Sequence, residues 1–230
     1  MLYEQFEKDD FLIQCGLIPK QLIKDIYDVY MDCIDKGETR EGDSPPMFGT
    51  AIELTDEKIF STTPFKKVES LLRNWLQENM QIRAIPTYNM GRVYTKDTTG
   101  MLKHKDRVPC EISVTLPIAY DNAPWQIYIE DREGIDRAVK LHVGDVAFYH
   151  GCRANHHRRN NSLNKFHIQH YFHFVDLDSE LGSFYNYFRQ GNDSKLWKGT
   201  LERIIKNNDL PILSDEDKIR YSKLIGEDNV

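Results

Sequence analysis

Between residues 81 and 175, one pattern dominates the chain: short segments rich in β-branched and aromatic residues, separated by Gly, Pro, Asp and Asn. Such segments form β-strands, because branched and aromatic side chains fit a pleated, half-buried surface. Their sequences are QIRAIP, YNMGRVYT, CEISVTLPIAY, WQIYIED, RAVKLHV, DVAFYH and KFHIQHYFHFV. So many short strands in so short a stretch predict a mainly β fold, either a sandwich or a jelly roll.

Helical patterns precede this β region. Apolar residues recur every three or four positions over 22–34, and again over 68–76, as they do on the buried face of a helix. Thr63 and Pro64 suit the start of the second helix, as N-cap and first helical residue. We interpret both stripes as flanking helices that pack against one face of the β core.

The 230 residues suffice for one domain with a sizeable core. We expect a single domain over 1–230, with a helical flank over 1–80 and a β core over about 81–176. A C-terminal helical flank over 177–230 ends in a charged tail. Residues 37–48 contain Gly, Ser and Pro and predict a polar loop.

Composition and charge exclude several classes of protein. A hydrophobic fraction of 40% argues against disorder throughout, and a net charge of −6 argues against broad, nonspecific binding to nucleic acid. We find no signal peptide and no apolar run long enough to cross a membrane. The cysteines lie far apart, without a C-x-x-C pair, which favours free thiols in a reducing cytoplasm. They are Cys15, Cys33, Cys110 and Cys152.

A histidine and an aspartate two residues apart, His104 and Asp106, lie in a predicted loop between two strands. Residues i and i+2 of an extended stretch point to the same side, so both side chains can aim at one point. An imidazole and a carboxylate are two thirds of the 2-His-1-carboxylate triad that suits Fe(II) and leaves coordination positions open. The pair therefore predicts part of a metal site.

The third ligand is expected from the later segment GDVAFYHGCRANHHRR, in which a Gly-Asp turn precedes an apolar strand. Three histidines compete for this role. His150 would belong to the strand itself, and His157 would point away if the local chain is extended. His156 follows the strand in a loop that can return to the metal, so we favour it over the other two.

A basic residue follows this segment: Lys165 opens the last long strand, nine residues past His156 (165 − 156). A keto acid such as oxoglutarate chelates iron at one end and leaves a distal carboxylate that needs a cation in a dry site. Lys165 is our candidate, and the alternative is a solvated lysine at a strand end. We interpret the remaining histidines as barrel-lining or satisfied core groups, and one of them as support for a metal ligand, in preference to a second metal. They are His142, His167, His170 and His173.

Together these residues resemble the Fe(II)/2-oxoglutarate-dependent dioxygenase superfamily, and within it the prolyl-4-hydroxylase-like branch. The resemblance covers about residues 88–175, and HKDRVPCEISVTLPI and GDVAFYHGCRANHHR look similar to small bacteriophage and marine bacterial members. It implies a double-stranded β-helix, which is a cupin-like jelly roll. It further implies Fe(II), with 2-oxoglutarate and O2 as cosubstrates, and the cytoplasm of a cell or of a phage host.

Carried over residue by residue, the resemblance makes His104, Asp106 and His156 the iron ligands. Lys165 matches the basic partner of oxoglutarate, although that partner is more often Arg and usually lies one residue further on. Tyr94 matches a tyrosine that commonly bonds the oxoglutarate carboxylate, with Tyr88 as a possible substitute. Halogenating relatives lack the carboxylate, so its presence here favours hydroxylation.

The sequence therefore predicts an oxygenase that hydroxylates a peptide or small-molecule substrate. Two other classes remain open: a non-catalytic jelly-roll protein that binds a metal or ligand, and a zinc-dependent hydrolase, since zinc accepts the same ligands. A visible absorption band that requires both Fe(II) and oxoglutarate would separate the oxygenase from both.

Overall fold

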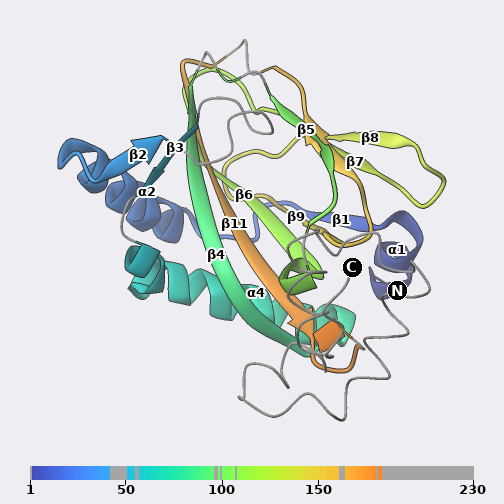
Figure 1. The fold of residues 1–230 in the computed structure, drawn as a ribbon. Coiled ribbons are helices and arrows are strands. Elements are labelled where there is room, and N and C mark those ends of the chain that lie inside the picture. Colours follow the sequence, from blue (N-terminus) through green and yellow to red (C-terminus); the bar gives the residue numbers. More distant parts are fainter. Residues whose placement is uncertain are drawn as a thin grey trace, which may run out of the picture.

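Two antiparallel sheets form the β core of the computed structural model, which describes residues 2–41, 51–54, 57–95, 98, 100–106, 108–160, 164–179 and 181–182 (Figure 1). In spatial order, the strands of the large sheet are β1 (Phe11–Gln14), β9 (Val146–Tyr149), β6 (Ile112–Tyr120), β11 (Phe166–Asp176), β4 (Ala84–Thr95), β3 (Ala51–Leu54) and β2 (Thr39–Glu41). Those of the small sheet are β5 (Met101–His104), β10 (His156–Arg158), β7 (Ile127–Glu130) and β8 (Asp136–Val139).

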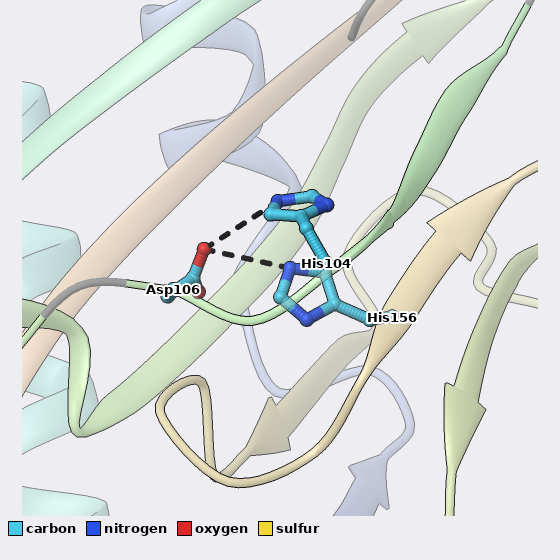
Figure 2. Close-up of side chains that lie close together, drawn as sticks. All are labelled: His104, Asp106 and His156. Carbon is cyan, nitrogen blue, oxygen red and sulfur yellow. Dashed lines mark ion pairs between the residues drawn. The ribbon is translucent and has the colours of Figure 1, made fainter. Parts of the chain in front are cut away.

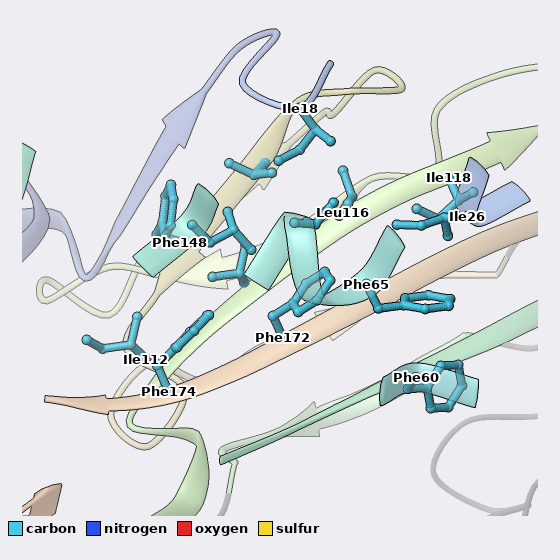
Figure 3. Packing of buried hydrophobic residues seen from close by; sticks show 14 of the residues in the cluster. Ile18, Ile26, Phe60, Phe65, Ile112, Leu116, Ile118, Phe148, Phe172 and Phe174 are labelled. Atoms are coloured by element: carbon cyan, nitrogen blue, oxygen red, sulfur yellow. The ribbon is translucent and has the colours of Figure 1, made fainter. Parts of the chain in front are cut away.

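Helices cover one face of the large sheet (Figure 1). The helices are α1 (Leu2–Asp9), α2 (Lys20–Asp35) and α4 (Thr63–Met80), with short 3-10 turns η1 (Glu57–Ser61) and η2 (Val108–Cys110). Ile26 of α2 and Phe65 of α4 pack with Leu116 and Phe172 of the sheet, and all four are fully buried (Figure 3). The two predicted helices and their packing role are thereby confirmed. None of the helices in the described residues is long and apolar enough to cross a membrane.

The opposite face of the large sheet meets the small sheet. Ala147 and Tyr149 of β9 pack with Ile127 and Ile129 of β7 in a second, smaller apolar cluster. Along β6 and β11, the residues on this inner side are mostly polar and yet buried; they include Ser113, Thr115, His167, Gln169 and His173. The space between the sheets is therefore lined mainly by buried polar side chains, next to a small apolar cluster.

The flanks differ from the expectation in detail. Short strands β1, β2 and β3 come from the segment expected to be helical and extend both edges of the large sheet. Strands of three or four residues are too short to show an alternating pattern, so the sequence does not reveal them. Residues 39–41 of the predicted loop form β2, while 42–48 lie outside the described residues.

The β core itself follows the prediction with local corrections. The expected segments QIRAIP and YNMGRVYT form a single strand, β4, and β5 and β10 form strands where loops were expected. The N-cap of α4 is Thr62, not Thr63, and Thr62 makes no side-chain capping bond. Most of the C-terminal flank lies beyond the described residues, so its helices and the single-domain division of 1–230 stay predictions.

Candidate metal centre

Three side chains converge between the two sheets. His104 ends β5, Asp106 follows it by two residues, and His156 begins β10 directly opposite His104 in the β5–β10 pairing. The Asp106 Oδ1 atom lies 3.8 Å from His104 Nε2 and 3.5 Å from His156 Nε2 (Figure 2). One potential ligand atom from each residue lies within 4.8 Å of the others, which is close enough for all three to bind one ion.

Both imidazoles are held with the same ring nitrogen facing the centre. The Nδ1 atom of His104 lies 2.8 Å from the Leu102 carbonyl oxygen, and the Nδ1 atom of His156 lies 3.1 Å from that of Ala154. A carbonyl oxygen can only accept, so Nδ1 carries the proton in each ring. The Nε2 lone pairs are left for a metal, and this arrangement is typical of ligating histidines.

The carboxylate of Asp106 sits in a tight cradle. Its backbone N–H donates to the Gly151 carbonyl oxygen at 2.8 Å, and its Oδ2 accepts from the Ser113 hydroxyl at 2.7 Å. A Cβ atom on Gly151 would lie 2.6 Å from Oδ2 and 2.3 Å from the Cys110 carbonyl oxygen, so only glycine fits there. Because Oδ2 is engaged, Oδ1 alone faces the imidazoles and a bound metal would take one carboxylate oxygen.

The electrostatics of the centre suit a divalent cation. Burial alone would raise the pKa of Asp106, but His156, His173 and Ser113 hold it well below its usual range, so the carboxylate is ionised. Burial, and then the neighbouring His156, lower the pKa of His104, which favours the neutral, ligating form. A carboxylate with two imidazoles matches the donor set of non-haem Fe(II) sites.

The two competing histidines point elsewhere. His150 Nε2 lies 2.9 Å from Glu7 Oε1, and its ring packs on Phe6 with a centroid distance of 4.1 Å. His157 stacks on Tyr128, with centroids 5.0 Å apart. Neither is among the residues that converge on Asp106. The structure therefore brings together the three residues favoured by the sequence, although their role as metal ligands stays a prediction.

A second polar cluster lies between the sheets, two residues further along β10. The Tyr94 and Tyr171 hydroxyls are 2.9 Å apart, and the Arg158 guanidinium lies over the Trp125 ring, 4.9 Å from its centroid. Arg158 Nε and His167 Nδ1 are buried without a hydrogen-bond partner among the described residues. Burial, and next the positive charge of Arg158, lower the pKa of His167 to about 3. Because buried polar atoms are normally paired, the Arg158 donor suits an anionic ligand. The neutral His167 ring donates from Nε2 to Gln169 Oε1 at 2.7 Å, so its Nδ1 is an acceptor.

The predicted basic partner, Lys165, lies outside this cluster. Its side chain is exposed, and its backbone N–H donates to the Asp121 carboxylate at 3.0 Å. Tyr94 is in the cluster, as expected. Tyr88 is not, because its hydroxyl lies 3.0 Å from Cys110 Sγ and its ring packs on His173, near Asp106. The structure thus favours Tyr94 over the substitute that the sequence left open.

Sequence reasoning missed Ser113 and Gly151 as parts of the site, and it named Arg158 only as an alternative anchor, with Arg92 and Arg159, should Lys165 not serve. The structure favours Arg158 among these, because residues i and i+2 of a strand share a face and His156 already points inward. Ser113 lies on a buried strand without a motif, so no sequence signal identifies it. His173 reaches Asp106 through Ser113, with its Nδ1 atom 3.0 Å from the hydroxyl, which is the supporting role expected for one of the additional histidines.

Comparison of the sequence with protein-family models finds no match, and no curated protein matches it. Comparison of the structure finds many solved proteins. A prolyl-4-hydroxylase from Pseudomonas putida superposes with a TM-score of 0.57 at 12% identity, over 74% of this chain and 96% of that one. A prolyl hydroxylase from Trichoplax adhaerens, in complex with a peptide of hypoxia inducible factor, gives 0.61 at 11% identity, over 80% and 90%.

HygX from Streptomyces hygroscopicus, with nickel and 2-oxoglutarate bound, superposes with a TM-score of 0.59 at 10% identity, over 76% of this chain and 86% of that one. At such low identities the likeness shows the fold. It confirms the predicted jelly-roll core with flanking helices, and it places this chain's fold among those of 2-oxoglutarate and Fe(II) oxygenases.

Proposed function

We propose that this protein is an Fe(II)- and 2-oxoglutarate-dependent oxygenase whose iron is held by His104, Asp106 and His156. One observation carries the proposal: two imidazole Nε2 atoms and one ionised carboxylate oxygen converge inside a jelly roll. The fold agrees, because similar solved structures hold Fe(III) or nickel together with the keto acid.

The chemistry that iron, 2-oxoglutarate and O2 supply when bound is oxidation of an unactivated C–H bond, with release of succinate and CO2. The chain's own residues prepare for it. His104, His156 and Oδ1 of Asp106 would hold the metal ion. The bond from Ser113 to Oδ2 favours Oδ1 as the carboxylate atom that would bind it. Room for two cosubstrates is therefore preserved.

The distal carboxylate of oxoglutarate is assigned to Arg158 and Tyr94 of the second polar cluster. Arg158 Nε is a buried, unsatisfied donor in the described part of the chain, and an arginine bonds a carboxylate strongly. The exposed side chain of Lys165 gives less support to its role as the anchor. The role of Lys165 as the anchor stays a prediction. Titration of oxoglutarate into Lys165 and Arg158 variants can decide it.

The substrate is proposed to be a peptide or small molecule that is hydroxylated. Similar structures span both classes, since one binds a hypoxia inducible factor peptide and HygX binds hygromycin B. Others are described as an epimerase and a carbocyclase. Asp106 would take the position that a halide needs, and it therefore favours hydroxylation over halogenation. A cytoplasmic location suits a site that requires Fe(II).

Anaerobic titration tests the proposal. Adding Fe(II) and 2-oxoglutarate together should produce a visible charge-transfer band that neither gives alone. Asp106→Ala should abolish the band, whereas His157→Ala, a neighbour of His156 that faces away, should keep it. A protein that shows no band but hydrolyses model esters with Zn(II) would be a hydrolase instead. Succinate release in air, screened over peptides, sugars, nucleotides and amino acids, would then identify the substrate.

A further inference from the structure

The turn over 150–154, between β9 and β10, supplies two backbone carbonyl groups to the centre. The Gly151 oxygen accepts the Asp106 N–H at 2.8 Å, and the Ala154 oxygen lies 3.1 Å from Nδ1 of His156. The turn thus fixes the backbone of one proposed ligand and the ring orientation of another. Any displacement of the turn would move two of the three ligand atoms.

The turn is closed on itself and joined to the first strand. The Arg153 and Ala154 N–H groups both donate to the His150 carbonyl oxygen, at 2.9 and 2.7 Å. The His150 N–H donates to the Asp10 carbonyl oxygen at 3.0 Å, next to the β1–β9 pairing. The backbone of the turn therefore depends on residue 10, which lies about 140 positions away in sequence.

Ion pairs from Glu7 and Asp10 to two arginines, one in the turn and one between β7 and β8, reinforce this join. Arg153 Nε donates to Asp10 Oδ1 at 2.6 Å, and Arg132 reaches the same oxygen at 3.3 Å and Glu7 Oε2 at 3.0 Å. The close approach of His150, with smaller contributions from Arg153, lowers the pKa of Glu7 to about 2. Asp10 is buried, so its charge is held close to two guanidinium groups in a partly shielded place.

The backbone conformation of Asp10 favours glycine, so the aspartate found there indicates a contact made by its side chain. Its φ is 63°, a left-handed conformation that glycine adopts without cost and that other residues adopt rarely. Neighbouring Phe6 is fully buried and anchors the helix against His150. A strained, buried, charged residue at the end of the first helix indicates a specific contact, since a glycine would end the helix more easily.

We propose that Glu7 and Asp10 are positioning residues of the metal centre, which act by locking the 150–154 turn through Arg153. The inference rests on the proposed function, because it concerns the geometry of the same three ligands. It goes beyond that function by assigning a role to α1, which touches none of them. Metal sites demand ligands placed within a fraction of an ångström, and supporting partners of ligands strongly affect affinity.

Co(II) binding to the full-length protein tests the proposal, because the d–d bands of Co(II) report its affinity and its coordination geometry. Asp10→Asn keeps size and tolerates the left-handed backbone but removes the charge. We expect about tenfold weaker Co(II) binding and altered bands. Arg153→Gln should give a similar loss, and the two changes together should cost less than their sum, because they break the same contact.

Asp10→Gly separates positioning from folding. It relieves the backbone strain while removing the carboxylate, so metal-free thermal stability should be retained and Co(II) affinity should still fall. Asp178→Asn is the matched control, since it removes an ion pair with Arg83 that touches neither the turn nor the ligands. Parental Co(II) affinity in Asp10→Asn and Asp10→Gly would overturn the inference. Failure of the parent protein itself to bind Co(II) would instead overturn the proposed function.

Discussion

The two faces of the large sheet are built from the same strands and do opposite things. Toward the helices, β6 and β11 present Val114, Leu116 and Phe172, which are fully buried among apolar neighbours. Toward the small sheet, the alternate residues of the same strands include Ser113 and His173, which support Asp106. Alternation along a strand thus separates stability from chemistry by a single residue step.

The comparison teaches that burial alone does not identify the role of a residue. Both faces are buried, but one contributes free energy by removing apolar area from water. The other must satisfy each polar group with a partner. His170 is the exception, because it lies on the helix side. Its nitrogens meet the Tyr30 hydroxyl at 2.8 Å and the Asn89 side-chain oxygen at 3.2 Å.

The largest expected effect falls on the inner side. His156→Ala should abolish Fe(II)-dependent turnover, because a three-ligand site has no spare donor, while the free energy of unfolding of the metal-free protein changes little. Turnover assays and denaturant unfolding of the same preparation measure both. Near-parental turnover in His156→Ala and in His104→Ala would remove the distinction between the faces.

Phe172→Ala should give the opposite result. Deleting a fully buried aromatic ring leaves a cavity and costs about 3–5 kcal/mol of unfolding free energy, whereas Co(II) affinity of the folded protein should be unchanged. Urea unfolding and metal titration test the pair of expectations. An equally strong loss of metal affinity would show that the apolar face also tunes the centre.

The next effect concerns the cosubstrate. Arg158→Ala should weaken the binding of 2-oxoglutarate by about 2–4 kcal/mol, because a carboxylate is left buried and unpaired. This corresponds to a roughly thirty- to thousandfold higher Kd. Lys165→Ala is the matched comparison with an exposed cation, and Tyr94→Phe should lose less because it removes a neutral donor. Titration of the charge-transfer band measures all three. A strong loss in Lys165→Ala alone would restore Lys165 as the anchor.

The smallest effect concerns the dependence of the free energy of unfolding on pH. Burial lowers the pKa of His170 from 6.5 to about 3, so the folded state favours the neutral ring. The contribution of His170 to the free energy of unfolding is fully present above pH 6.5. It is lost as the pH falls from 6.5 toward 3. At about pH 5 the loss should reach about 2 kcal/mol. His170→Gln should flatten the stability–pH curve from 7 to 5, and the exposed His142→Gln should leave it unchanged.

The sequence predicts the β core and the three converging residues because both depend on local patterns. Strand composition identifies the sheets, and the spacing of His104 and Asp106 places them on one side. The cation that would bind the distal carboxylate of 2-oxoglutarate is less predictable. Lys165 has the expected spacing from His156, but its side chain is exposed to solvent. Ser113 lies only seven residues from Asp106 but belongs to no motif. The contact between Asp10 and Arg153 joins residues 143 positions apart, which a single sequence does not encode in any local pattern.

Strand β1 can pair with β9 only late in synthesis, because β9 lies far along the chain. Phe11 lies opposite Tyr149, 138 residues later (149 − 11). At about 5–20 residues per second of synthesis, the first strand spends roughly 7–30 seconds on the ribosome before its partner exists. Such long-range pairings also make folding slow. The proposed metal centre, which also needs His156, therefore cannot be complete before this late stage of synthesis.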